Sequence, residues 1–233
     1  MTHSHQGLRE GRWSSYAGRV NEHLSKLIGL ALSEDIGSGD VTSEYFVPAD
    51  EVSRGFIVAR EPGVLAGTEV ARAVFEAVDP KLEVEVLIED GASVAPGAHV
   101  LRVSGSSRAV LTAERTALNF LQRLSGVATM TRRFVDEVSG TGVRILDTRK
   151  TTPGWRALEK AAVVAGGGHN HRMGLYDRAM VKDNHLVAEG GFAELQSAIE
   201  RLRRERPGVE VELEADRVEQ VAEFLKLEGI DHI

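Results

Sequence analysis

The chain has 233 residues, no cysteine and a formal net charge of −7 at pH 7. The lack of cysteine excludes disulfides, thiolate nucleophiles and cysteine-ligated metals, and the acidic balance argues against a general nucleic-acid surface. No apolar run approaches the roughly 18 residues that a membrane-spanning helix needs. We therefore expect a cytoplasmic protein with no nucleic-acid partner and no membrane segment.

The first half of the chain predicts a mixture of helices and strands. Residues 1–20 are polar, and we expect them to be disordered or frayed. Apolar residues at helical spacing predict a helix over 21–32, which the polar run EDIGSGDVTS ends. The alternating stretch 82–88 predicts a strand. The other elements expected here are a strand over 52–60, a helix over 67–78 and two short strands within 89–110.

The second half begins with a long amphipathic helix, expected from about residue 111 to 138 with a break near Gly126. Beyond it, strand-like and helix-like runs alternate, which predicts parallel strands joined through helices. We expect an N-terminal α+β domain over 21–117 and a barrel-like α/β domain over 118–233. The expected strands are 143–146, 179–181, 209–213 and 229–233, and the expected helices are 154–165, 191–205 and 216–227.

Cationic and imidazole side chains gather between residues 145 and 185 of this acidic chain. Several of them follow a predicted strand, and Glu214 follows another. Because the C-terminal ends of parallel strands share one rim, where α/β folds place their chemistry, the pattern favours a small pocket for a polyanion. The residues of this cluster are Arg149, Lys150, His171, Arg172 and Lys182.

Other interpretations of single residues stay open. His169 and His171 have the spacing of a zinc pair in a metal-dependent barrel hydrolase, although they follow glycines and precede an arginine. Arg123 on the long helix is by default a solvated arginine. Glu214 ends a buried-looking strand, where an unpaired carboxylate is costly, and this favours a ligand or metal role.

Six motifs, taken together and in order, resemble the quinolinate phosphoribosyltransferase family. They extend from about residue 25 to the end of the chain, and the set is specific although each motif alone is weak. The resemblance implies an α/β chain with an N-terminal α+β open sandwich domain and a partial, C-terminally truncated TIM-like barrel. The motifs are EDIGSGDVTS, ERTALNFLQRLSGVAT, DTRKTTPG, GGGHNHRMGL, VKDNH and VEVELEADRVEQV.

The resemblance also implies an activity. Enzymes of this family join quinolinate to 5-phosphoribosyl-1-pyrophosphate with Mg²⁺, giving nicotinate mononucleotide, CO₂ and pyrophosphate in NAD biosynthesis. It implies that Lys150 and Glu214 are catalytic, with Glu214 near the ribose hydroxyls and Mg²⁺. It places Arg115 in the pocket of a partner subunit, so that a homodimer shares its active sites. The implied quinolinate-binding residues are Arg149, Lys150, His171, Arg172 and Lys182.

Two departures from the family pattern accompany this resemblance. Val164 stands near a place where the family often carries arginine, and the family continues past residue 233 with a further strand and glycine-rich phosphate-binding loops. We therefore expect a truncated chain that is inactive by itself. The alternatives are a related protein associated with molybdenum transport, and a degenerate barrel that binds a dicarboxylate without turnover.

Overall fold

The computed structural model of the chain describes residues 10–182 and 191–233, which form two units, Met1–Asn170 and His171–Ile233. The first unit is built on an antiparallel sheet and the second on a pair of parallel strands. Among the residues described, no helix combines the length and the apolar character that crossing a bilayer requires.

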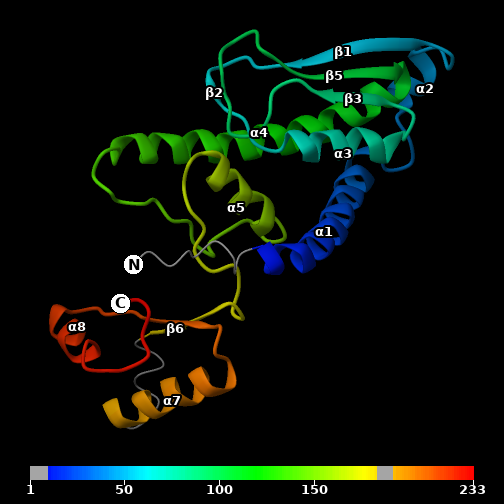
Figure 1. Cartoon of the computed structure of the whole chain (residues 1–233). Helices are drawn as coiled ribbons and strands as arrows, with labels where there is room; N and C mark the ends of the chain where they lie inside the picture. The colour runs from blue at the N-terminus through cyan, green and yellow to red at the C-terminus, as the bar shows by residue number, and fades with distance from the viewer. Residues whose placement is uncertain (1–9, 183–190) are drawn as a thin grey trace. The chain divides into compact units, whose positions relative to one another are not determined.

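A three-stranded antiparallel sheet in the order β1-β5-β3 forms the frame of the first unit. Two helices, α3 (Thr68–Val78) and α4 (Ser107–Glu137), lie against one face of this sheet (Figure 1). On the other face, Arg102 of the central strand forms an ion pair with Glu85. A sheet covered on one face is the open sandwich that the family resemblance implies. The strands are β1 (Val52–Val58), β3 (Glu83–Val86) and β5 (His99–Ser106).

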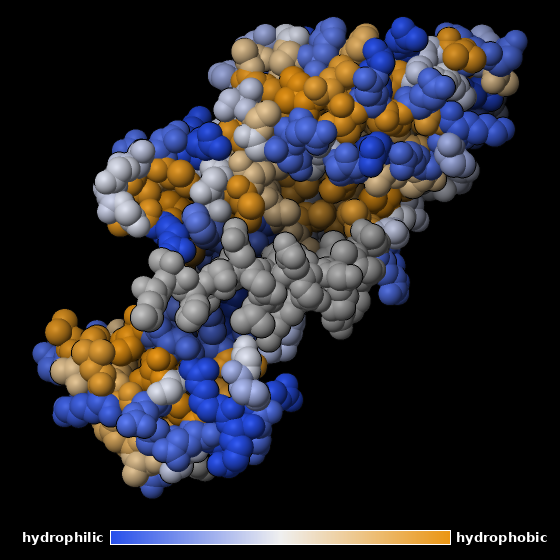
Figure 2. Space-filling model, in the orientation of Figure 1, coloured by the Kyte–Doolittle hydropathy of each residue, from blue (hydrophilic) through white to orange (hydrophobic). Residues whose placement is uncertain are grey.

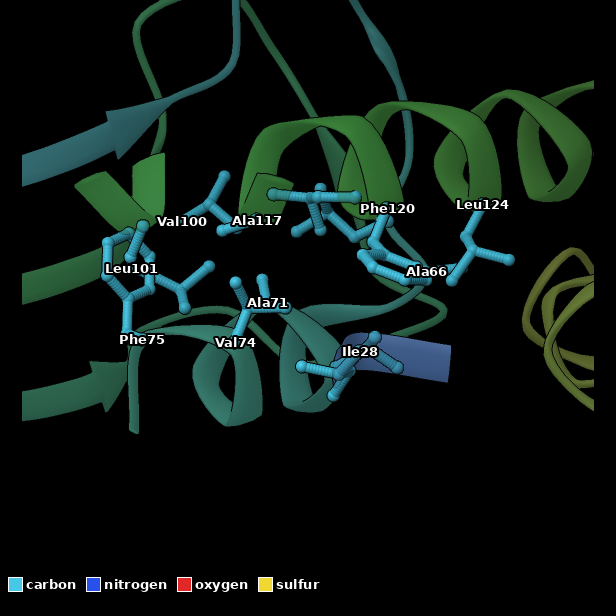
Figure 3. Packing of buried hydrophobic residues seen from close by; sticks show 14 of the residues in the cluster. Ile28, Ala66, Ala71, Val74, Phe75, Val100, Leu101, Ala117, Phe120 and Leu124 are labelled. Carbon is cyan, nitrogen blue, oxygen red and sulfur yellow. The ribbon is translucent and has the colours of Figure 1, made fainter. Parts of the chain in front are cut away.

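The hydrophobic core of this unit fills the layer between the sheet and the two helices. Leu101 and Val103 alternate along β5 and are buried, as expected for the inward face of a strand. Figure 3 shows Phe75 of α3 and Phe120 of α4 in the same layer. Burying each such side chain contributes about 1.5–3 kcal/mol, so this layer holds α4 firmly in place.

The remaining elements of the first unit surround this layer. The Asp40 carboxylate links the segment 41–46 to α4, because it accepts hydrogen bonds from the Ser43 amide at 3.0 Å and from the Thr112 hydroxyl at 2.8 Å. Hydrogen bonds from Ser43 and Thr112 lower the pKa of Asp40. The elements are α1 (Glu10–Ile36), α2 (Val41–Phe46), the antiparallel pair β2 (Gly63–Val64) and β4 (Ser93–Val94), and α5 (Arg156–Ala165).

The second unit contains two parallel strands with a helix between them in sequence. Strand β6 pairs with β7 in parallel, as the sequence predicts for this half of the chain. Val211 and Leu213 of β7 are buried together with Ile199 and Phe224 of the helices. The elements are β6 (Arg178–Val181), α7 (Phe192–Glu205), β7 (Glu210–Leu213) and α8 (Val218–Phe224).

Two helices are longer than expected. Helix α1 begins at Glu10, so residues 10–20 are helical rather than frayed, and residues 1–9 lie outside the described residues. Helix α4 is continuous from Ser107 to Glu137, so the expected break near Gly126 is wrong. A single glycine costs a helix only about 1 kcal/mol, and the buried side chains of Leu124 and Ala128 on either side hold the helix together.

Two expected strands are reduced to single bridges. Within the described residues, Leu146 alone of 143–146 bridges a neighbour, His169, and within 229–233 only His232 bridges, to Glu212. Strands require partners on a sheet. Val143 and Leu146 are 59% and 51% exposed, so among the described residues neither side chain is covered as it would be in a buried strand.

Candidate active site

The parallel strand pair of the second unit has one apolar face and one charged face. Along β7, Val211 and Leu213 are buried, while Glu210, Glu212 and the following Glu214 alternate with them. Side chains two residues apart lie on the same side of a strand. Strands of parallel sheets usually read as apolar runs, so an acidic and basic face indicates a surface that meets a polar ligand.

At the C-terminal end of these strands, two predicted site residues meet. The Lys182 ammonium lies 2.8 Å from each carboxylate oxygen of Glu214. Their side chains are 40% and 44% exposed, so the pair remains open to solvent. The structure thus brings together the residues that follow β6 and β7, as expected for one rim of a parallel sheet.

His171 lies in a charged network on the same face. Its Nε2 atom is 2.8 Å from a carboxylate oxygen of Glu212 and 2.9 Å from the guanidinium of Arg178, which itself donates to Glu212 at 3.0 Å. Burial acts to raise the pKa of Glu212, but the hydrogen bond from Arg178 and the charge of His171 outweigh it, and the pKa is lowered. Glu212 is therefore ionised and orients the imidazole.

Sequence reasoning missed Arg178 and Glu212. A signal for Glu212 is present, because it lies two residues before Glu214 on a strand and so shares its face. Arg172 lies along β6, where its guanidinium is 3.3 Å from the Arg178 carbonyl oxygen and 3.2 Å from the Met180 sulfur.

In the first unit, Arg149 and Lys150 lie in the loop that follows the bridge at Leu146. The chain turns there through hydrogen bonds from the Lys150 amide to the Thr148 hydroxyl at 3.1 Å and from the Thr151 amide to the Arg149 carbonyl at 3.0 Å. The Nε atom of Arg149 is buried and has no hydrogen-bond partner in the part of the chain that the structure describes. Such an unsatisfied donor is rare in folded proteins and fits a site for an anionic ligand.

Two charged side chains of α5 contact the ends of this loop. Glu159 accepts hydrogen bonds from the Thr152 amide at 3.0 Å and the Thr152 hydroxyl at 2.8 Å. Lys160, 1% exposed, forms a buried ion pair with Asp147. Burial opposes the ionisation of Glu159, yet the hydrogen bonds from Thr152 and Arg123 overcome it and lower its pKa.

The two arginines of α4 differ in their surroundings. Arg115 is exposed. Arg123, expected to be simply solvated, is 57% exposed but also donates to Glu159 at 3.1 Å and to the Thr152 hydroxyl at 3.2 Å. Arg123 thus holds Glu159 and Thr152 at the end of the loop that carries Arg149 and Lys150.

The glycine-rich segment contacts α4 closely. A Cβ atom on Gly166 would collide with the Ala128 carbonyl oxygen, and one on Gly168 would lie 2.9 Å from a Thr131 methyl group. These glycines permit helix packing, which is a sufficient reason for their presence.

The zinc-pair interpretation receives no support. Across residues 10–182 and 191–233, no group of three or more histidine, aspartate or glutamate side chains is placed to hold a metal ion. The backbone of His169 joins the segment before the loop, because its amide donates to the Ile145 carbonyl at 2.8 Å and its carbonyl accepts from the Asp147 amide at 3.1 Å.

The predicted site residues divide between the two units. Arg115, Arg149 and Lys150 belong to Met1–Asn170, and the remainder belong to His171–Ile233. Within the units, the structure brings Arg149 and Lys150 into one loop and joins Lys182 to Glu214. Asp183, Asn184 and His185 of the VKDNH motif lie outside the described residues.

Two domain families match the chain. The family model described as "Quinolinate phosphoribosyl transferase, N-terminal domain" matches residues 40–125, and the corresponding C-terminal domain matches 127–233. The expected boundary between residues 117 and 118 stays a prediction.

Named relatives agree with these families. The nicotinate-nucleotide pyrophosphorylase (carboxylating) of Mycobacterium leprae is 46% identical over 201 residues, which are 85% of this chain and 70% of that protein. The chloroplastic nicotinate-nucleotide pyrophosphorylase (carboxylating) of Arabidopsis thaliana is 44% identical over 205 residues, 87% of this chain and 58% of that protein. The chain therefore spans less than two thirds of the length of the plant relatives that it matches.

Solved structures match as well. The crystal structure of NadC from Streptococcus pyogenes superposes with a TM-score of 0.82 at 38% identity, covering 89% of this chain and 73% of that one. The nicotinate-nucleotide pyrophosphorylase of Francisella tularensis gives 0.80 at 34% identity, covering 88% and 71%. These names favour neither the molybdenum-associated alternative nor the metal-dependent hydrolase, and the chain belongs to the quinolinate phosphoribosyltransferase family.

Proposed function

We propose that this protein transfers the phosphoribosyl group of 5-phosphoribosyl-1-pyrophosphate to quinolinate and forms nicotinate mononucleotide, CO₂ and pyrophosphate, a step of NAD biosynthesis. The observation that carries the proposal is the charged face of the β6–β7 pair in a chain of this family. The names of the relatives supply the reaction.

Quinolinate carries two carboxylates, so its recognition requires several fixed cations. The proposed binding residues provide guanidinium, ammonium and imidazole groups, of which guanidinium can bind a carboxylate through two hydrogen bonds. The buried Nε of Arg149, which has no partner among the described residues, supports this role, since a bound carboxylate would satisfy it. The proposed set is Arg149, Lys150, His171, Arg172 and Lys182.

The reaction needs charge stabilisation rather than a protein nucleophile. The quinolinate ring nitrogen forms a bond to the ribose carbon as the bond from that carbon to the pyrophosphate oxygen breaks. The resulting pyridinium then loses its adjacent carboxylate as CO₂, and the electron pair left on the ring carbon takes up a proton. We assign Lys150 and Glu214 to this centre, where an ammonium offsets the departing negative charge and a carboxylate faces the electron-poor ribose.

Mg²⁺ is proposed as the cofactor. The donor set fits a metal carried by the substrate: Glu214 is the candidate carboxylate, and Mg²⁺ bound to phosphates needs only one or two protein carboxylates. Glu214 would face the Mg²⁺ ion that the bound substrate carries. The ion would offset the negative charge that develops on the leaving pyrophosphate.

We propose a homodimer in which Arg115 reaches the partner's pocket. Exposed aromatic side chains on α2 support association, since Tyr45 and Phe46 are 79% and 82% exposed. A cytoplasmic location is also proposed, because a cysteine-free chain fits a reducing compartment. Subcellular fractionation tests this location, and recovery of the protein in an organelle fraction would contradict it.

Titration calorimetry of the full-length protein with quinolinate tests the pocket. Each charge-assisted hydrogen bond contributes roughly 1.5–3 kcal/mol, so Arg149→Ala and Arg172→Ala should each weaken binding about tenfold or more. Arg102→Ala, which removes an arginine from the open face of the sheet, is the control and should leave the Kd unchanged. Parental affinity in both pocket variants would refute the assignment.

A further inference from the structure

Helix α5 contacts both ends of the loop that carries Arg149 and Lys150. At the start of the loop, Lys160 forms its ion pair with Asp147. At the end, Glu159 accepts both hydrogen bonds from Thr152. Two adjacent residues of one helix therefore hold the two residues that flank the cationic segment 148–151.

Further contacts strengthen each end. The Asn170 amide nitrogen, oriented to match its neighbours, donates to Asp147 at 2.6 Å and to the Lys160 carbonyl at 2.9 Å. In the first turn of α5, Arg156 donates to the Thr151 hydroxyl at 3.2 Å. Helix α5 thus contacts the loop at Asp147, Thr151 and Thr152.

The burial of these charges requires an explanation. Glu159 and Lys160 are 8% and 1% exposed, although glutamate and lysine are seldom buried. Desolvating an ion pair commonly offsets its attraction, and an apolar pair would attach a helix equally well. Charged groups differ from apolar ones in that their hydrogen bonds fix a single geometry.

We propose that Glu159 and Lys160 are positioning residues for the cationic loop. They fix the backbone on both sides of 148–151, so that the Arg149 guanidinium and the Lys150 ammonium are arranged for an anion before it arrives. Preorganised cations bind more tightly because no ordering cost remains at the moment of binding. The proposal deepens the proposed function and rests on it for the identity of the anion.

Glu159→Gln is the first test. Glutamine has nearly the shape of glutamate, but its one oxygen cannot replace both carboxylate oxygens that Thr152 and Arg123 contact. In the ligand-free protein, hydrogen exchange of residues 148–152 should accelerate by about tenfold. The Kd for quinolinate should rise by about the same factor.

A matched control is available in Asp90→Asn. The Asp90 carboxylate also accepts two amides and a hydroxyl, from Gly67 and Thr68, at the start of α3. This variant should melt at a lower temperature while the exchange of 148–152 and the Kd stay parental. If Glu159→Gln behaves in the same way as Asp90→Asn, the carboxylate of Glu159 only stabilises the fold and the proposal is wrong.

A double-mutant cycle isolates the contact itself. Thr152→Val removes the hydroxyl, and if Glu159 acts through Thr152, then the combined variant should lose less affinity than the sum of the two single losses. Full additivity would show that Glu159 acts by another route.

Lys160 needs a compensated variant, because Lys160→Met alone removes the cationic partner of the buried Asp147 carboxylate and threatens folding. The combination Asp147→Asn with Lys160→Met removes both charges. It should retain cooperative melting and still bind quinolinate about tenfold more weakly. Parental affinity in this folded variant would overturn the role of Lys160.

The two proposals can fail separately. If the unaltered protein shows no heat of binding with quinolinate, the proposed function fails. The exchange of 148–152 in Glu159→Gln needs no ligand, and parental exchange there would refute the positioning role by itself.

Discussion

Buried charges in the first unit have partners on other segments of the chain. Lys160 of α5 pairs with Asp147, and Glu159 of the same helix pairs with Arg123 of α4. Removing one member of such a pair leaves a desolvated group without compensation, which is far more costly than losing an exposed ion pair. Substitutions at these residues should therefore have large effects on stability.

Glu159 provides the sharpest pH prediction. Its pKa in the folded protein lies below the ordinary 4.5, so its contribution to stability is complete above that value and is lost as the pH falls through the folded pKa. Glu159→Gln should lower the free energy of unfolding by about 1–3 kcal/mol at neutral pH. The difference from the parent should shrink below pH 4.5.

Urea unfolding followed by circular dichroism at several pH values measures this difference. Glu22→Gln is the control, because Glu22 forms an exposed pair with Lys26, and such pairs contribute about 0.5 kcal/mol or less. A Glu159→Gln deficit that persists unchanged in acid would show that the carboxylate charge has no part in it.

Glycines in two elements have opposite roles. Gly126 lies on the exposed side of α4, where an added Cβ atom would have no described neighbour within 4 Å, whereas Gly166 ends α5 directly against the backbone of α4. Gly166 also offers its carbonyl to Arg132 at 3.0 Å. The close contact between α4 and α5 therefore depends on Gly166 and not on Gly126.

This contrast gives a paired prediction. Gly126→Ala should stabilise the protein by about 0.5–1 kcal/mol, because alanine restricts the unfolded chain and favours the helix. Gly166→Ala should destabilise it by about 1–3 kcal/mol through overpacking against Ala128 and Thr131. Thermal unfolding of both variants decides the matter, and a lower melting temperature for Gly126→Ala would indicate that α4 needs flexibility there.

Periodicity explains which elements could be predicted from the sequence. The alternation of β3 and the helical spacing of α3 are local patterns, and both elements lie where they were expected. A strand such as 143–146 depends on neighbours that are remote in sequence, and the pattern cannot supply them.

The candidate site shows the same limit. The Lys182–Glu214 pair follows from the rule that parallel strands end on one rim. The contact of Glu159 with Thr152 depends on how the loop turns, whereas Thr151 and Thr152 followed by Pro153 are by themselves typical of the start of a helix. The structure places the N-terminal cap of α5 at Trp155.

At the scale of the whole molecule, apolar side chains reach the surface of both units (Figure 2). On the first unit, Val41, Tyr45 and Phe46 of α2 are each more than 60% exposed, as is Val52 at the start of β1. Exposed apolar residues that cluster on one element are typical of association surfaces. The proposed homodimer would cover them.

Hybrid dimers test the shared site. In the full-length protein, Arg115→Ala and Lys150→Ala should each abolish most turnover, and mixing the two preparations should restore part of it, because a hybrid dimer can hold one intact site. Product formation is followed by chromatography of nicotinate mononucleotide. As the control, each variant is taken through the same mixing procedure alone and should remain inactive. If mass spectrometry shows subunit exchange and no turnover returns, the sites are not shared.

Trp155 gives the cationic loop an intrinsic optical reporter. Its indole stacks on Phe120 with ring centroids 4.6 Å apart, and its amide donates to the Thr152 carbonyl at 3.0 Å. The other tryptophan of the chain is Trp13, so Trp13→Phe would leave Trp155, at the end of the loop, as the single tryptophan. Its emission would then follow anion binding in real time by stopped flow, without any attached dye.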